Sequence, residues 1–488
     1  MNQQRWINIG WSQISITPDR PVFNHGQMYQ RVSQYVHDPI TVTALVLDNG
    51  HEQLILLSAD MTSIRGNILE KLKKNLSGTK GLDVSKLSFS VTHTHNSSNF
   101  GETKLTHSLA IDKEIMPEID VPDNIFYGDE AEDFLVEKLA EVVNKAWETK
   151  KPGGISYAQD YAAVAFNRRP VFENDGQKQS VMYGVCDDPS FKGFEGTSDH
   201  TADMLYTWDL NGNLTGIAVN IPCPSQVYEL HCFITADYWA PTRNAIREKF
   251  GKPVYVLSLC GAGGDQNPLD LVRLSKNNKK TFKVWGGQTG EVLRNFDMAL
   301  ECEDIAQRIA DCVVRGFKKA RNYIDNNPMF KHEIVKMELP IRKVKEEDYQ
   351  EARRLFTDHV KKFSPENRMT MKDVVYLFEP QGVLLRYEMQ NKTDVFEFDM
   401  HVIRLGNIAI STNPFELFTE YGMRIKARSR AEQTFIIQLA NGAGGYLPTE
   451  AAVAGGSYSS KPASTTCGPD SGDKLVEITL DVMNKMWA

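Results

Sequence analysis

The chain has 488 residues, enough for two or three ordinary domains or for one large, elaborated domain with a substantial core. Hydrophobic residues make up 41% and charged residues 24%, and a net charge of −8 leaves no basic excess, so we expect no nucleic-acid partner. The seven cysteines are scattered without a Cys-x-x-Cys pair, and the sequence has neither a secretion signal nor an apolar stretch of roughly 20 residues that would span a membrane. These features predict a cytoplasmic globular protein that does not insert into a membrane.

The N-terminal half predicts a sheet with intervening helices. Strands are expected over 7–16, 40–48 and 53–59, the last two joined by an Asn49-Gly50 turn, which is the strongest short hairpin signal. A short helix (66–76), a strand (87–92) and a well-patterned helix (130–149) follow. Short strands then surround a long loop (171–203), before a helix (236–250) that ends at Gly251 and a buried strand (254–259).

The C-terminal half continues the alternation of helices and strands. The pattern predicts helices over 303–324, 343–363, 415–428 and 473–487, the second of them charged and solvated, and strands over 402–410 and 434–439. The sequence has no repeat of fixed period and no break in composition. We therefore predict a mixed α/β class: one large multi-layered domain over residues 1–488, with mixed sheets and flanking helices.

A His-x-His tripeptide, His93-Thr94-His95, follows the alternating apolar run 87–92. Side chains alternate faces along a strand, so two histidines spaced i, i+2 point the same way where the strand opens into a loop. Neutral imidazole is the commonest protein ligand for zinc, and the polar loop that follows would leave such an ion open to substrate. Taken alone, the pair fits equally well two solvated or hydrogen-bonded imidazoles.

Four further polar or glycine-rich segments each come directly after an apolar strand. They cover 166–170, 220–237, 263–268, and 413–416 together with 441–449. Strand ends converge at one edge of an α/β sheet, so we expect these segments to meet there. Their candidate site residues are Asn167, Arg168, Arg169, Gln226, His231, Asp237, Asp265, Gln266, Asn267, Glu416 and Tyr446.

The order and spacing of these motifs resemble the catalytic domain of the neutral/alkaline non-lysosomal ceramidases. The shared motifs, in chain order, are Ile16-Thr17-Pro18, Thr92 to His95, Asn167-Arg168, Thr235-Ala236-Asp237, Gly264 to Pro268, Pro414 to Glu416 and Gly445 to Thr449. Each motif is short, but together they occur in the same order over nearly the whole chain. This order is specific to the superfamily, but it does not indicate which substrate a member acts on. The resemblance implies a single ceramidase-like catalytic domain, and we expect the C-terminal immunoglobulin-like module of that family to be missing.

The resemblance also implies roles for individual residues. In that family two histidines, a glutamate and a tyrosine hold one zinc ion, which implies His93, Glu416 and Tyr446 as ligands here. His95 would transfer the proton and Arg168 would stabilise the oxyanion, because zinc lowers the pKa of its water from 15.7 to about 7 and a guanidinium is a strong oxyanion donor. The remaining candidates divide into catalytic residues, Asp237, Asp265 and Asn267, and substrate-binding residues, Asn167, Arg169, Gln226 and Gln266.

The sequence departs from the family at two positions. Pro224 or a neighbour stands where the second histidine ligand is expected, so His231 becomes the candidate for the fourth ligand, with Cys223, Glu229 and His200 as lesser candidates. Asn267 replaces a serine that ceramidases use in amide cleavage, and an amide cannot act as a general acid or base. The resemblance is therefore to a divergent member, for which we expect a substrate other than ceramide.

The function that we predict from these residues is a zinc-dependent, amidase-like hydrolase of bacterial origin. It would attack an amide, ester or lactone bond of a small polar substrate through metal-bound water, with one zinc or another divalent metal as cofactor. A homo-oligomer is compatible with the sequence. Two alternatives stay open: a metal-dependent lyase or isomerase acting on a hydroxylated small molecule, and a non-catalytic binding protein whose site has decayed. Glu416 fits equally an acid at the start of the helix 415–428.

Overall fold

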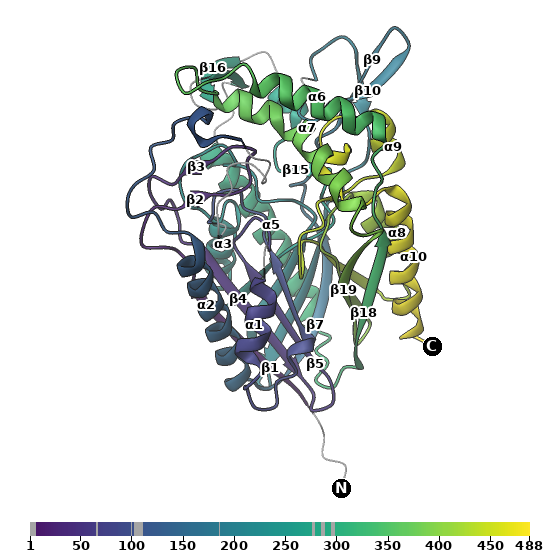
Figure 1. Cartoon of the computed structure of the whole chain (residues 1–488). Helices are drawn as coiled ribbons and strands as arrows, with labels where there is room; N and C mark the ends of the chain where they lie inside the picture. The colour runs from purple at the N-terminus through teal and green to yellow at the C-terminus, as the bar shows by residue number, and fades with distance from the viewer. Residues whose placement is uncertain are drawn as a thin grey trace.

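The computed structural model describes residues 6–64, 67–98, 100–101, 111–184, 186–275, 279–284, 288–293 and 298–488. Strands and helices alternate along the chain, which confirms the mixed α/β class (Figure 1). None of the helices in these ranges has the length and apolarity needed to cross a membrane.

Two sheets form the centre of the molecule. The larger has eight strands in the order β14-β13-β12-β7-β1-β4-β5-β6, and the smaller has four in the order β18-β19-β20-β22. The pairs β5/β6, β13/β14 and β20/β22 are parallel, and the other neighbours are antiparallel. The large sheet comprises β1 (Ile7–Ser15), β4 (Thr41–Asp48), β5 (Gln53–Ala59), β6 (Leu87–Val91), β7 (Lys151–Tyr161), β12 (Thr201–Asp209), β13 (Leu214–Ile221) and β14 (Tyr255–Cys260). The small sheet comprises β18 (Phe330–Pro340), β19 (Val395–Leu405), β20 (Ile408–Thr412) and β22 (Gln433–Ile437).

Alternation along the strands divides their side chains between two kinds of core. Leu45 and Leu47 of β4 lie in a core that the large sheet shares with Ile408 and Ile410 of the small sheet. Their neighbour Val46 lies on the opposite face, among helical side chains. The two sheets therefore pack face to face, with helices on their outer faces. On the large sheet these are α1 (Ile68–Leu76), α2 (Gly128–Glu148), α3 (Trp239–Phe250) and α5 (Met298–Ala320), and on the small sheet they are α8 (Thr419–Arg428) and α10 (Pro469–Lys485) (Figure 1).

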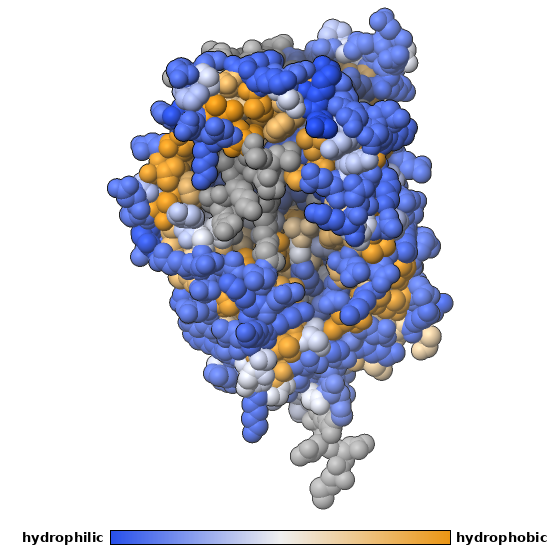
Figure 2. Space-filling model, in the orientation of Figure 1, coloured by the Kyte–Doolittle hydropathy of each residue, from blue (hydrophilic) through white to orange (hydrophobic). Residues whose placement is uncertain are grey.

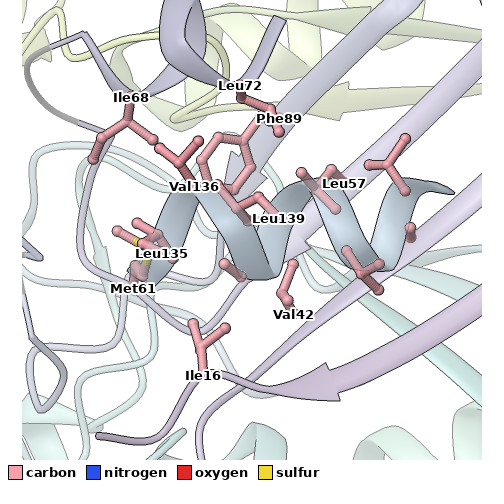
Figure 3. Close-up of a cluster of buried hydrophobic side chains, with 14 of the residues drawn as sticks. Ile16, Val42, Leu57, Met61, Ile68, Leu72, Phe89, Leu135, Val136 and Leu139 are labelled. Atoms are coloured by element: carbon pink, nitrogen blue, oxygen red, sulfur yellow. The ribbon is translucent and has the colours of Figure 1, made fainter. Parts of the chain in front are cut away.

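Helix α2 illustrates how an outer layer is held. Its buried stripe includes Leu135 and Leu139, at the i, i+4 spacing of one helix face. Figure 3 shows this stripe beside Val42, Leu57 and Phe89 of the sheet. Full burial of an aliphatic side chain contributes about 1.5–3 kcal/mol, so the stripe fixes α2 to the sheet.

Prediction and structure differ in the segments 171–203 and 402–410. The expected loop 171–203 contains a small three-stranded sheet, and the expected strand 402–410 is a hairpin. In that hairpin β19 ends at Leu405, Gly406 turns with φ 61°, and β20 begins at Ile408. The sequence pattern did not indicate a turn here, because the turn glycine lies inside an apolar run. The small sheet of the first segment consists of β9 (Pro170–Asn174), β10 (Gln177–Ser180) and β11 (Phe191–Phe194).

A helical hairpin, α6 (Glu346–Val360) and α7 (Met371–Gln390), lies across the top of the molecule in Figure 1. As predicted, α6 is charged and exposed, with Ala352 and His359 as its buried residues. Helix α7 was not predicted; it starts with a capping box between Thr370 and Asp373. Figure 2 shows a mostly hydrophilic face on which apolar side chains gather where these helices lie.

The remaining elements are short. They are β2 (Phe23–Asn24), β3 (Arg31–Val32), β8 (Phe166–Asn167), β15 (Gln266–Asn267), α4 (Leu271–Leu274), β16 (Lys279–Val284), β17 (Gln288–Leu293), β21 (Glu416–Leu417), β23 (Tyr446–Leu447) and α9 (Glu450–Gly455). Among them, the two-residue strands β21 and β23 matter most for the site.

Candidate metal centre

The loops that follow several strands meet at one end of the sheets, as the sequence predicts. Ser225, beyond β13, donates to the carbonyl of Thr92, beyond β6, at 2.8 Å. The loop after β14 reaches the segment after β20, because the Gly264 amide donates to the carbonyl of Leu417 at 2.8 Å. This convergence places side chains far apart in sequence around His93.

The two histidines of the His-x-His tripeptide converge, but for a different reason from the one predicted. Strand β6 ends at Val91, and His93 adopts a left-handed backbone conformation with φ 66°. This conformation is uncommon outside glycine and breaks the pleat, so a turn after the strand brings the rings together. The Nε2 atoms of His93 and His95 lie 3.4 Å apart.

A backbone carbonyl fixes the tautomer of His93. Its Nδ1 lies 2.7 Å from the carbonyl oxygen of Thr62, beyond the neighbouring strand β5, so Nδ1 carries the proton and donates. In the neutral ring the Nε2 lone pair is directed into the site, where Nε2 lies 3.3 Å from Oε2 of Glu416. A metal-binding histidine is held in this way, with its other nitrogen donating to a carbonyl.

Glu416 lies on a strand and not at a helix start, because helix α8 begins only at Thr419. Strand β21 pairs in parallel with β23, with Glu416 in register with Tyr446. Burial opposes ionisation of Glu416, but a protonated His93, together with Arg168 and Tyr446, outweighs it, so the pKa of Glu416 is lowered. Burial, reinforced by Glu416 and opposed by Arg168, raises the pKa of Tyr446 well above its usual value.

His95 lies in a shell of amides and one carboxylate. Gln226 accepts from Arg168 through Oε1, so its Nε2 donates to Nε2 of His95 at 2.6 Å. The Nδ1 of His95 then carries the proton and lies 3.6 Å from Oε2 of Glu229. Burial, with contributions from His93 and nearby arginines, lowers the pKa of His95 well below its usual value, so the ring is neutral at rest.

Arg168 lies behind Tyr446, away from the open side of the site. Its side chain is deeply buried, at 2% exposure, and its Nη2 donates to the Tyr446 hydroxyl at 3.0 Å and to the Gly264 carbonyl at 2.8 Å. Its Nη1 reaches Gln226 and Tyr183. The expected role as a direct oxyanion donor does not match this placement; Arg168 instead supports the oxygen of Tyr446.

A polar cavity of about 790 Å³ opens onto this cluster. His93, His95, Glu416 and Tyr446 line one part of it, together with Tyr458, whose ring packs edge-on against Tyr446 with centroids 5.4 Å apart. The other walls come from the loop after β2, the segment after β5, helix α7 and the loops around 441–445 and 463–466. The cavity makes the centre accessible to a small molecule.

The donor set fits a zinc ion. A neutral imidazole nitrogen, a carboxylate and a phenolic oxygen are ligands that zinc accepts, and ligands about 2.0–2.1 Å from a tetrahedral metal lie roughly 3.3 Å apart. The distance of 3.3 Å from His93 Nε2 to Oε2 of Glu416 matches this separation. In the described parts of the chain no three His, Cys, Asp or Glu side chains form a metal site, so the set depends on Tyr446.

The structure does not bring His231 into this cluster. Its ring packs against Tyr228 and Phe233, its Nδ1 lies 3.3 Å from the carbonyl of Tyr228, and its own carbonyl accepts from Arg31 and Asn96. It therefore does not supply the missing ligand. Gln226 takes the space beside His95 instead, and of the lesser candidates only Glu229 lies near His95.

Arg169 and Asp237 serve local structure. Arg169 forms a bidentate ion pair with Glu195 and donates to several carbonyls between 452 and 458. Asp237 accepts from the backbone amides of Tyr228 and Tyr238, and burial raises its pKa to about 6. Neither side chain lines the cavity, so the expected substrate and catalytic roles have no geometric support.

The other four candidates form a buried network under the floor of the site. Asp265 accepts from Asn167 at 2.9 Å and from the Thr419 hydroxyl at 2.7 Å, which ties β8 to the start of α8. Gln266 donates to the Thr197 carbonyl, and Asn267 donates to the Tyr183 hydroxyl. Their contacts position Arg168 and its neighbours, because Arg168 donates its backbone amide to the Asp265 carbonyl.

Three residues at the site were not predicted. Thr62 orients His93, Gln27 reaches Nδ1 of His95 at 3.4 Å, and Tyr458 contacts Tyr446. The rule that strand ends converge would have found Thr62, because it follows β5, the parallel neighbour of β6. Gln27 lies in a loop between two-residue strands and carries no such signal.

Comparisons with known proteins identify the fold. The chain resembles the crystal structure of neutral ceramidase from Pseudomonas aeruginosa, with a TM-score of 0.69 and 13% identity over 99% of this chain and 75% of that one. A second solved structure, described as a ceramidase complexed with C2, matches with a TM-score of 0.68 and 14% identity over 99% and 76%. No family model and no curated protein sequence matches the chain. The fold is therefore ceramidase-like, as the motifs indicate.

Proposed function

We propose that this protein is a zinc-dependent hydrolase that cleaves an amide bond, or a related ester or lactone, in a small polar substrate. The ceramidase-like fold supports the reaction class by analogy, since the neighbouring structures are described as ceramidases. The polar cavity supports a small polar substrate.

One observation carries the metal assignment: acceptor atoms face each other across the site. In a neutral His93 the lone pair is on Nε2, because Nδ1 donates to Thr62, and this nitrogen lies 3.3 Å from a carboxylate oxygen of Glu416. The Nε2 of His95, which accepts from Gln226, is equally close. Buried acceptors in mutual contact are unfavourable without a cation or proton between them.

In this proposal His93, Glu416 and Tyr446 hold the ion, and His95 lies beside it. Zinc in such a set supplies Lewis acidity toward a carbonyl oxygen and toward water. The hydrogen bond from Arg168 to the Tyr446 hydroxyl favours negative charge on that oxygen, which a ligand phenolate requires.

His95 is the residue that moves the proton. It is neutral at rest, and its Nε2 lies 3.4 Å from that of His93, so it can accept a proton there when the hydrogen bond from Gln226 to the same nitrogen is released, and return it to the leaving group. Glu229, close to Nδ1, stabilises the imidazolium that forms. The loss of the family's serine at Asn267 leaves this step unaffected, because Asn267 contacts Tyr183 and does not line the cavity.

The test combines metal analysis with product analysis. Protein purified without chelator should carry one zinc per chain, and a panel of N-acyl amines, esters and lactones should contain a substrate whose acid product takes up one oxygen from ¹⁸O-water. Metal-free protein, or a product without solvent oxygen, would contradict the proposal, and the second result would favour a lyase or isomerase.

A further inference from the structure

The cavity beside the metal centre contains one charged side chain that the centre does not use. Among the described residues that line it, Glu416 and Arg386 carry formal charges besides the histidines, and Glu416 belongs to the centre. Arg386 projects from helix α7, on the wall of the cavity formed by the α6/α7 hairpin. An arginine in this position either has an acidic partner in the protein or is available to a ligand.

The protein provides no acidic partner for Arg386. Its Nη1 donates to the hydroxyl of Thr466 at 3.1 Å and lies 3.1 Å from the sulfur of Met389. Neither Nε nor Nη2 has a hydrogen-bond partner in the described parts of the chain, and no carboxylate forms an ion pair with this guanidinium there. Burial lowers its pKa with little opposition from nearby charge. A partly buried cation without a counter-charge is unfavourable unless a ligand supplies one.

The guanidinium is held close to the centre by tight packing. A Cβ on Gly382 would lie 2.6 Å from the Cβ of Ala463, so α7 packs directly on the segment that follows α9. The Thr466 hydroxyl, which accepts from Arg386, lies 3.9 Å from the position that a Cβ on Gly445 would take. Gly445 directly precedes the metal-site residue Tyr446, so Arg386 and the centre face one cavity at short range.

We propose that Arg386 binds an anionic group of the substrate, so that the hydrolase acts on small acyl compounds that carry a single negative charge, a carboxylate or a sulfonate. A guanidinium offers two parallel N–H groups to such an oxyanion. One arginine with no lysine or second arginine in the described cavity lining matches one negative charge. Calling the bound anion a substrate rests on the proposed hydrolase function. The anion-binding site itself does not depend on that function.

The experiment uses matched ligands. N-acetylglycine, N-acetyl-β-alanine and N-acetyltaurine are compared with the carboxamide or sulfonamide of each, first by binding to the full-length His93→Ala variant, which does not turn over, and then by hydrolysis with the wild-type protein. The anionic member of at least one pair should bind about 10- to 100-fold more tightly, as expected for hydrogen bonds to charged groups. The carboxylate and sulfonate members show which oxyanion is preferred.

The substitutions isolate Arg386. Arg386→Gln should bring the ratio within each pair to about one, and Arg386→Lys should restore part of it. Arg342→Gln is the matched control, because Arg342 also is partly buried, lacks an acidic partner in the described chain and donates to the same loop at Ser460 and Thr465, but it does not line the cavity. This control should leave the ratio unchanged, and the melting temperature of each variant shows whether it folds.

The outcomes separate this inference from the proposed function. A charge preference that Arg386→Gln retains, equal binding of both members of every pair, or no binding of any anionic member at millimolar concentration overturns the anion site. Hydrolysis of neutral members without any charge preference overturns the anion site and leaves the hydrolase intact. A charge preference that depends on Arg386 in binding, without turnover of any ligand, supports the anion site and counts against the hydrolase.

Discussion

Two pairs of buried histidines touch in the described parts of the chain, and their nitrogen atoms are arranged differently. His332 donates through Nδ1 to the carbonyl of Gln53 at 2.8 Å, and its Nε2 lies 2.9 Å from Nδ1 of His401. Because His332 Nε2 must then accept, His401 Nδ1 donates, and the contact is a complementary hydrogen bond. His93 also donates through Nδ1 to a carbonyl, but its Nε2 faces the accepting Nε2 of His95 and the carboxylate of Glu416.

The comparison separates a structural pair from a candidate metal centre. Burial alone does not distinguish them, since both pairs are buried and burial lowers the pKa of His332, His401 and His95. What differs is whether every lone pair meets a donor. A satisfied pair stabilises the fold, whereas convergent acceptors indicate a site that a cation completes.

The largest effect should come from removing one histidine of each pair. His93→Ala should lower zinc affinity by more than about 100-fold and abolish hydrolysis, because loss of outer-shell partners alone costs about 10- to 100-fold. His332→Ala should lower the melting temperature and leave the metal content of the folded protein unchanged. Metal analysis, chelator competition and thermal unfolding measure both, and the comparison fails if the two variants lose zinc equally.

The next largest effect concerns the carboxylate beside each pair. Glu416→Gln keeps the shape of the side chain but removes its charge 3.3 Å from His93, so zinc affinity should fall by about 10- to 100-fold. Glu52, which accepts from the backbone amide of His332 and pairs with Lys86, provides the matched control Glu52→Gln. Normal zinc affinity in Glu416→Gln would rule out this carboxylate as a ligand.

Lowering the pH should reduce the stability of the protein through the pair His332/His401. The pKa of His332 is lowered to about 4 and that of His401 to about 3, mainly by burial, from 6.5. Below about pH 6.5 these histidines bind protons in the unfolded chain but stay neutral in the folded chain. The free energy of unfolding therefore decreases as the pH drops, by about 1.4 kcal/mol per histidine near pH 5.5. Urea unfolding at about pH 7.5 and 5.5 measures the loss, which should be smaller in His401→Gln. An unchanged loss in that variant would contradict the assignment.

The sequence predicts more of the centre than of its surroundings. The convergence of strand ends predicts that their polar segments meet, the resemblance to ceramidases implies His93, Glu416 and Tyr446 within them, and the structure brings these three residues together. The orientation of each side chain was not predictable, since it depends on a left-handed His93 and on a carbonyl beyond another strand. Arg386 could not be found either, because nothing in the sequence of α7 indicates that this helix packs beside the centre.

The smallest effect should come from Glu229, which faces the second nitrogen of His95. Glu229→Gln removes the charge 3.6 Å from Nδ1, so the pKa of His95 should fall further, and kcat should drop by about 3- to 10-fold with unchanged zinc content. The acid limb of the kcat profile should move to lower pH, a shift that a purely structural role would not produce. Glu52→Gln, beside the other pair, should leave that limb in place. If the acid limb of the kcat profile does not move in Glu229→Gln, then His95 does not take up the proton. The pair His93/His95 would then differ from the pair His332/His401 only in binding a metal.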